Sequence, residues 1–248
     1  MAHVDGLSSL TSQDGRFTAL VVGSRLQLKC PHGCVRRPLA REVQRARPVR
    51  AILADRTPRI ADAMGGAQPV IEKALSQLGV ELRPEFALKS IDSSGVVLAS
   101  GERLAACTVV WCGGMHAHPL TQGFPVALDP LGRVPVDAFM RVNHVPGVFA
   151  AGDSACAIID GARPTVMSCQ HARPMGRYAG YNVVCDLLCL EMRPLYIDWY
   201  TTILDLGPWG AVYTDGWERR LVAQGADAKK TKLMINHDRI LPPRSGNK

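Results

Sequence analysis

Apolar runs alternate along the chain with polar turns and with stretches of helical spacing. Residues 17–22, 50–56 and 108–114 each contain a short apolar run typical of a buried strand. Residues 147–153, "GVFAAGD", predict another strand that ends in Gly-Asp. Between these runs, residues 69–79 place their apolar positions on one helical face, between a proline and a glycine. The alternation predicts an α/β architecture with nucleotide-binding character.

The remaining segments add shorter elements to this outline. Three β-like segments separated by turn residues lie between residues 80 and 100, and residues 132–142 suggest a turn and a strand edge. A helix is expected over 174–190. Residues 194–214 are aromatic and β-prone, which favours core strands of a small terminal domain. A surface that faces a membrane or a quinone remains the alternative interpretation of this tail.

Composition places the chain among ordinary globular proteins. Its 248 residues, 47% of them hydrophobic, suffice for one large domain or two small ones. No run of 18 apolar residues and no signal peptide are found, so we expect a cytoplasmic location. The eight cysteines form no C-x-x-C pair, and we expect most of them to be reduced packing residues.

The basic segment 36–50 carries six arginines and one glutamate within a chain of net charge +7. A solvated helix face explains this segment best, because no aromatic residues interleave to stack bases, and we expect no nucleic-acid partner. Cys30, His32 and Cys34 could ligate zinc but lack a fourth ligand nearby, so no metal site is predicted. A metal- or nucleic-acid-binding module built on residues 29–50 stays open as an alternative function.

The glycine turn after the first predicted strand is unusual. Gly23 stands where a dinucleotide-binding G-x-G-x-x-G motif would begin, but no second or third glycine follows in place. Codons that allow Gln27–Val35 also allow, in a shifted frame, a sequence typical of the helix that follows such a turn. We therefore hypothesise a frame disturbance between Gly23 and Arg41, which the coding DNA would decide.

Four stretches resemble one family of flavoproteins. They are "ERLAACTVVWCGGMHAHPL" (102–120), "GRVPVDAFMRVNHVPGVFAAGDSACA" (132–157), "PTVMSCQHARPMGRYAGYN" (164–182) and "DLGPWGAVYTDGW" (205–217). The chain resembles the FAD-dependent pyridine nucleotide oxidoreductases and is most similar to the type II NADH dehydrogenase-like branch. The resemblance implies a Rossmann-like fold of two dinucleotide-binding domains, with FAD and NADH as cofactors.

The same resemblance implies a domain plan. Residues 1–114 would form an NADH-binding domain whose glycine turn is disrupted at 24–40. Residues 115–190 would form the carboxyl-terminal half of an FAD-binding domain, and 191–248 a small β-rich domain. The family's first G-x-G-x-x-G, which holds the ADP half of FAD, has no counterpart before Phe17. We therefore expect an N-terminally truncated flavoprotein that does not bind FAD tightly alone.

Candidate site residues follow from the residues and from the resemblance together. Gly152 and Asp153 end the predicted strand where a carboxylate can accept hydrogen bonds from the ribityl hydroxyls, and Gly23 and Gly113 would approach the nicotinamide dinucleotide. Asp55 would bind the adenine ribose and repel the 2′-phosphate of NADPH, although Arg56 weakens that preference. Residues 168–171 precede the predicted helix and would meet the pyrimidine end of the flavin; they are Ser168, Cys169, Gln170 and His171.

The function implied is transfer of hydride from NADH to FAD and then of electrons to an acceptor, most simply a quinone. Gln170 and His171 would protonate or orient that acceptor, and a structural hydrogen-bonding role for His171 is an equal alternative. Peripheral contact with the inner face of a membrane and homo-oligomer formation stay open. The main rival is a non-catalytic remnant of such an enzyme.

Overall fold

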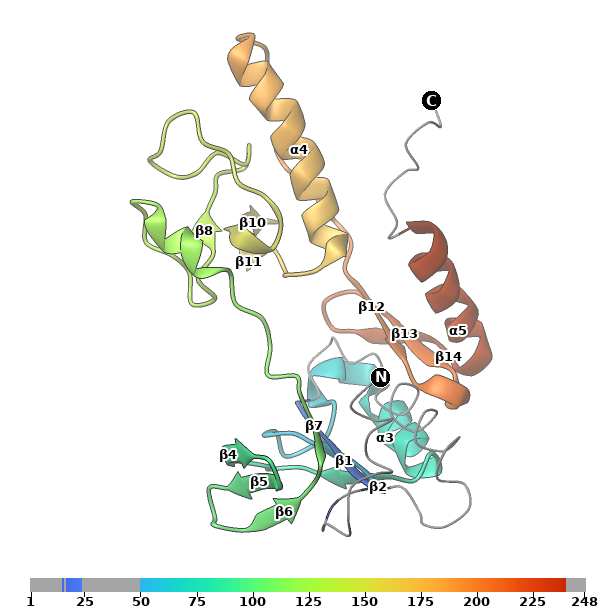
Figure 1. Cartoon of the computed structure of the whole chain (residues 1–248). Coiled ribbons are helices and arrows are strands. Elements are labelled where there is room, and N and C mark those ends of the chain that lie inside the picture. Colours follow the sequence, from blue (N-terminus) through green and yellow to red (C-terminus); the bar gives the residue numbers. More distant parts are fainter. Residues whose placement is uncertain (1–14, 16, 24–49, 240–248) are drawn as a thin grey trace. The chain divides into compact units, whose positions relative to one another are not determined.

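The computed structural model describes residues 15, 17–23 and 50–239, and the chain divides into two compact units (Figure 1). The first unit comprises residues 1–114 together with 201–248, and the second unit comprises residues 115–200. The three-domain plan expected from the sequence, with boundaries after residues 114 and 190, stays a prediction. Residues 191–200 group with the second unit, and the strands that follow them group with the first.

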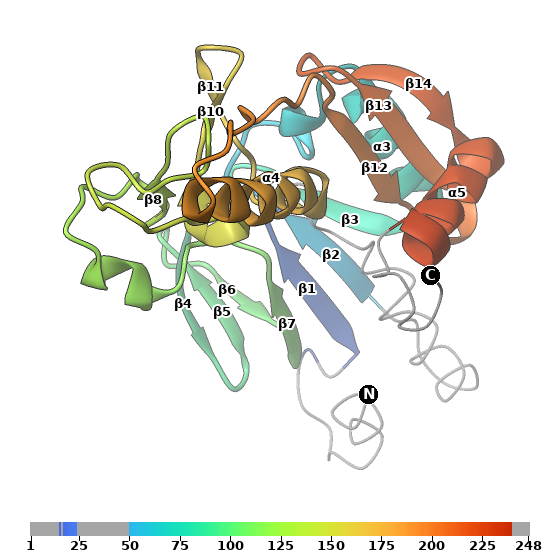
Figure 2. The same cartoon turned by 90° about the horizontal axis from the view of Figure 1, so that it is seen from above.

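The first unit is built on a four-stranded parallel sheet. Its strands are β1 (Thr18–Val22), β2 (Arg50–Ala54), β3 (Val80–Arg83) and β7 (Thr108–Trp111), in the spatial order β3-β2-β1-β7 (Figure 2). All three pairings are parallel, so the carboxyl ends of the four strands lie along one edge. These strands confirm the runs predicted from the apolar pattern, and in such sheets ligands bind at this edge.

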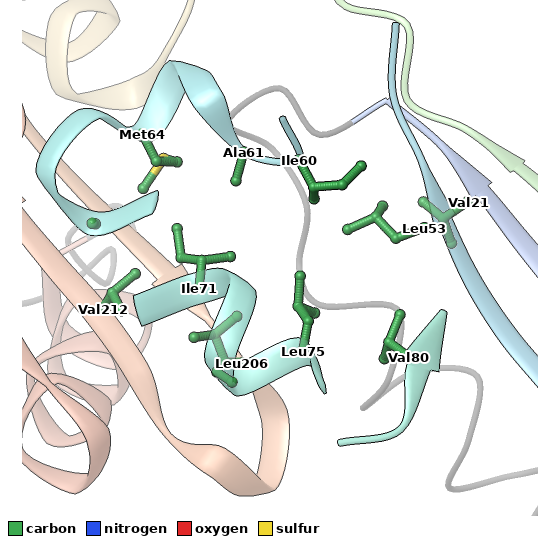
Figure 3. Packing of buried hydrophobic residues seen from close by; sticks show 12 residues of the cluster. Val21, Leu53, Ile60, Ala61, Met64, Ile71, Leu75, Val80, Leu206 and Val212 are labelled. Atoms are coloured by element: carbon green, nitrogen blue, oxygen red, sulfur yellow. The ribbon is translucent and has the colours of Figure 1, made fainter. Parts of the chain in front are cut away.

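Side chains of the parallel strands alternate between two hydrophobic clusters. Val21 and Leu53 point into one cluster with η3 (Asp62–Ala67) and α3 (Gln68–Gln77), which Figure 3 shows from close by. Leu20 and Ile52 point to the opposite face. There they meet a meander of β4 (Leu88–Asp92), β5 (Gly95–Leu98) and β6 (Arg103–Ala105). Both faces of this sheet are therefore covered.

The carboxyl-terminal segment belongs to the same core. It forms β12 (Thr201–Asp205), η6 (Gly207–Trp209), β13 (Ala211–Asp215), β14 (Arg220–Gln224), α5 (Gly225–Met234) and a last turn, η7 (Ile235–Arg239). Leu206 and Val212 are buried in the cluster around α3, and the indole Nε1 of Trp209 donates to Gln77 Oε1 at 2.7 Å. The predicted β-prone tail thus supplies core strands.

The second unit has much less regular structure. Apart from α4 (Cys169–Leu187), it contains the short pairs β8 (Val134–Pro135) with β9 (Ala155–Cys156) and β10 (Ile158–Ile159) with β11 (Arg163–Pro164). Two short 3-10 turns, η4 (Pro119–Gly123) and η5 (Gly152–Ser154), complete it. Its core gathers eight buried apolar side chains: Val134, Val136, Met140, Val142, Ala155, Ala157, Met175 and Ala179.

Two predicted elements of the second unit need correction. The helix expected over 174–190 begins at Cys169 and ends at Leu187, because burial of His171 and Met175 carries the helix through Pro174. The strand expected over 147–153 is reduced to a single antiparallel bridge between Phe149 and Arg141, followed by η5. Among the described residues, this extended segment pairs only along one side.

Candidate functional site

Gly23 ends β1 at the carboxyl edge of the parallel sheet. Its φ of +102° lies in the region that favours glycine, and an added Cβ would overlap the carbonyl oxygen of Cys112. Its amide donates to Ala54 O at 2.7 Å, while the Cys112 amide donates to Val22 O at 2.8 Å. A glycine is therefore required where the ends of β1, β2 and β7 meet.

Asp55 follows β2 at the same edge and is only 7% exposed. Its carboxylate oxygen Oδ1 accepts hydrogen bonds from both the backbone amide and the hydroxyl of Thr57, each at 2.9 Å. Its own amide donates to Arg83 O at the end of β3. This carboxylate is thus held in one orientation and does not behave as a solvated strand-end residue, whereas the neighbouring Arg56 is exposed.

Gly113 lies just beyond β7 on the same side of the sheet. An added Cβ would overlap the indole ring of Trp111, which is itself 59% exposed. The structure therefore brings Gly23, Asp55 and Gly113 to the ends of adjacent strands, and their role in binding a dinucleotide stays a prediction. At this edge β7 and β2 flank β1 on opposite sides. In open α/β sheets, nucleotides usually bind at the carboxyl ends of strands arranged in this way.

Gly152 and Asp153 form η5 in the second unit, directly beside the first turn of α4. Gly152 has a φ of +75°, and a Cβ there would lie 3.8 Å from the Cβ of Ala172. The side chain of Asp153 is exposed. The structure thus brings Asp153 close to the beginning of α4, as the proposed flavin site requires.

Ser168 occupies the N-cap position of α4 without capping it. Its carbonyl accepts from the amides of His171 and Ala172, but its hydroxyl makes no capping bond. The hydroxyl oxygen is buried and has no hydrogen-bond partner within the described residues. A serine at this position ordinarily bonds the amides of the first turn. The first turn also contains no acidic residue, and Cys169 at its start is exposed.

His171 belongs to this first turn, and its side chain is fully buried. Its Nδ1 accepts a hydrogen bond from the Val166 amide at 3.0 Å, and its ring meets the ring of Tyr200 edge-on, with centroids 6.3 Å apart. Burial lowers the pKa of His171, and a hydrogen bond with the Trp199 backbone offsets part of that shift. This environment favours the structural role for His171, while Gln170 beside it is half-buried.

Two buried polar residues that the sequence analysis did not single out, Arg133 and Asn182, support the second unit. Arg133 is 4% exposed, pairs with Asp129 at 2.7 Å and donates to Thr165 O at 2.5 Å. Burial raises the pKa of Asp129, but hydrogen bonds from Arg133, and its charge, outweigh burial and lower that pKa below its ordinary value. Asn182 of α4 bonds Phe139 O, Arg193 O and the Arg193 amide. In the sequence, the only sign of these buried residues was a charged or amide side chain within an apolar run.

Other predicted chemistry falls outside the described residues. Cys30, His32 and Cys34 and the basic segment 36–49 are among the residues whose placement the structure does not describe. Within the described ranges, no cluster of three His, Cys, Asp or Glu side chains could hold a metal ion. No helix in the same ranges has the length and hydrophobicity needed to cross a bilayer.

Comparison with known proteins identifies a family and several relatives. Residues 39–176 match the family model described as pyridine nucleotide-disulphide oxidoreductase. The chain is 54% identical over 200 residues to an NADH dehydrogenase-like protein of Mycobacterium tuberculosis, an alignment that covers 80% of this chain. It is also 29% identical over 114 residues to a type II NADH:quinone oxidoreductase of the same organism, across 42% of this chain and 24% of that relative.

The fold is shared with a solved NAD-dependent persulfide reductase from A. fulgidus. The two agree with a TM-score of 0.65 at 18% identity, over 80% of this chain and 36% of the reductase. The alignment with the 54% identical mycobacterial relative covers 50% of that relative. The chain therefore spans about half the length of this curated relative.

Proposed function

The chain belongs to the pyridine nucleotide-disulphide oxidoreductase family and is similar to NADH dehydrogenase-like proteins. We therefore propose that it functions as an FAD-dependent NADH oxidoreductase. The first unit would bind NADH, and the second unit would hold part of the flavin. A quinone is the acceptor we propose, because one of the relatives is named as an NADH:quinone oxidoreductase.

The carboxyl edge of the parallel sheet is the observation that carries the NADH proposal. Gly23 lets the ends of β1 and β7 approach closely, because a Cβ there would overlap the Cys112 carbonyl oxygen, and Asp55 presents an oriented carboxylate at the end of β2. A carboxylate at this place binds ribose hydroxyls and repels an added 2′-phosphate. Thr57 would act as a positioning residue that holds this carboxylate in place.

The beginning of α4 fits the flavin. The buried Ser168 hydroxyl without a partner and the uncapped first turn offer a polar group and the positive end of a helix dipole. Asp153 in η5 would accept hydrogen bonds from the ribityl hydroxyls. The chemistry that FAD would supply here is acceptance of hydride from NADH and delivery of electrons to a second substrate.

At the acceptor side, we assign different roles to two neighbouring residues. Gln170, half-buried in the first turn, is proposed to contact the acceptor. His171 is proposed to position that turn, because its ring is buried and bonded to the Val166 amide. A non-catalytic remnant is the second candidate, and it is favoured because no second or third glycine follows Gly23 in the spacing of a dinucleotide-binding turn.

Calorimetric titration of the purified chain with NADH and NADPH tests the proposal. We expect NADH to bind more tightly than NADPH, and Asp55→Ala to weaken NADH binding about tenfold or more. Asp55→Asn keeps the shape of the side chain and should reduce the preference for NADH over NADPH. Asp62→Ala, an exposed partner of Arg59 in the same unit, serves as the control. Absence of NADH binding, or equal binding by all variants, would support the remnant.

A further inference from the structure

Trp111 is the last residue of β7, at the carboxyl edge of the parallel sheet, and it is 59% exposed. It pairs in register with Val22, so the two side chains leave the sheet on the same face. Val22 is buried in the cluster beneath the meander, whereas Trp111 belongs to neither of the two clusters that cover this sheet. Tryptophan side chains are mostly buried in folded proteins, so an indole exposed at a ligand-binding edge needs a reason.

The ring of Trp111 lies against the backbone of Gly113. A Cβ added at Gly113 would overlap three atoms of the indole, Nε1, Cε2 and Cζ2. Gly113 lacks the positive φ found at Gly23 and Gly114, so its backbone conformation does not itself require glycine. The absence of a side chain at Gly113 therefore gives the indole its place. Gly113 is a positioning residue for an aromatic ring whose surface stays largely exposed.

The position of Trp111 along the edge indicates which part of a dinucleotide it would meet. Strands β2 and β7 flank β1 on opposite sides, so Asp55 and Trp111 end the two strands next to β1. A dinucleotide whose adenine ribose is bound by Asp55 and which crosses the end of β1 brings its nicotinamide half to β7. Indole rings stack on planar ligand rings, and they attract a cationic ring more strongly than the other aromatic side chains do.

We propose that the indole of Trp111 stacks on the nicotinamide ring of the bound dinucleotide and that Gly113 holds the indole in place for this contact. The inference rests on the proposed function, because it takes NADH to bind at the same edge. It adds the residue that recognises the reacting ring, which Asp55 does not contact. Stacking fixes the plane of that ring and shields one of its faces from water.

Calorimetric titration of the full chain with NADH and with ADP-ribose, which lacks the nicotinamide ring, tests the stacking contact. Trp111→Ala should weaken NADH binding about tenfold and leave ADP-ribose binding unchanged. Unchanged ADP-ribose binding also reports that the variant is folded. Trp111→Phe should lose less affinity for NADH, because the smaller ring still stacks. Trp199→Leu, at a tryptophan of the second unit that is 44% exposed, should change neither affinity.

A double-mutant cycle tests the positioning role of Gly113. Gly113→Ala should weaken NADH binding by about the same factor as Trp111→Ala, because the added methyl group displaces the indole. In the Trp111→Ala background, the same change at Gly113 should have no further effect. Gly123→Ala, where an added Cβ meets no atom within 4 Å, serves as the control.

The outcomes separate this inference from the proposed function. If NADH binds the unmodified chain and Trp111→Ala equally well, the stacking role is overturned and the proposed function stands. Equal losses of NADH and ADP-ribose binding also overturn the inference, because they indicate a structural role or a contact with adenine. Independent effects of Gly113→Ala and Trp111→Ala would remove the positioning role. Failure of the unmodified chain to bind NADH would overturn both proposals.

Discussion

The two units differ in how completely they bury their apolar residues. The first unit covers both faces of its parallel sheet, with α3 and β12–β13 on one side and the meander β4–β6 on the other. The second unit relies on one helix and two short strand pairs, and it leaves apolar side chains of α4 exposed. The difference indicates that the first unit draws more of its stability from a continuous apolar core than the second unit does.

The largest effect is expected from Leu20→Ala in β1. Leu20 is fully buried under the meander, so its truncation should lower the free energy of unfolding by about 3–4 kcal/mol. Urea denaturation followed by circular dichroism measures the change. Val222→Ala, at an exposed position, should cost less than about 0.5 kcal/mol. A loss of similar size in both variants would contradict the idea of a tight core in the first unit.

A smaller loss is expected from Asn182→Ala in the second unit. The substitution removes three hydrogen bonds and leaves the Arg193 amide without its acceptor, at a cost of about 2 kcal/mol. Hydrogen exchange should show faster exchange at Arg193 than in the unmodified chain. Asn143→Ala, whose side chain makes no hydrogen bond in the described residues, is the matched control. Unchanged exchange at Arg193 would show that Asn182 does not secure that segment.

The smallest effect concerns the pH dependence due to His171. Burial lowers its pKa in the folded chain below the ordinary value of 6.5, so the unfolded chain binds the proton more readily. Stability should therefore fall as the pH drops below about 6.5, by at most about 1.4 kcal/mol per pH unit. Above that pH this residue should contribute no slope.

Two histidine variants test whether this pH dependence of stability comes from His171. His171→Gln should unfold more easily at every pH but lose this part of the acid slope in thermal melts. His116→Gln, at an exposed histidine, should keep it. An identical slope in His171→Gln and in the unmodified chain would remove the buried histidine as its source.

The sequence predicted the first unit better than the second for a physical reason. Strands β1, β2 and β7 are apolar on both faces, so continuous runs such as "ALVV" and "AILA" identify them locally. Residues 147–153 have an equally apolar run, yet in the part of the chain that the structure describes Phe149 pairs only with Arg141. A strand needs neighbours that the local pattern does not report.

The same limit applies to the candidate site. Gly23 and Asp55 could be identified because a glycine and a carboxylate directly follow apolar runs. The burial of His171 and the network of Arg133 with Asp129 and Thr165 depend on contacts between distant segments. Spacing alone therefore could not decide whether His171 lies on a surface or in a core. It also could not show that α4 would extend back through Pro174 to Cys169.

Visible absorbance of bound flavin tests the central claim most directly. FAD is titrated into the purified chain and into Asp153→Ala, and the change in flavin absorbance gives the affinity of each. The account predicts that Asp153→Ala weakens FAD binding about tenfold, because a charge-assisted hydrogen bond to the ribityl chain is lost. Asp160→Ala, at another exposed carboxylate of the same unit, should leave the affinity unchanged. Equal affinity in all three chains, or no change in flavin absorbance with any of them, would contradict the account.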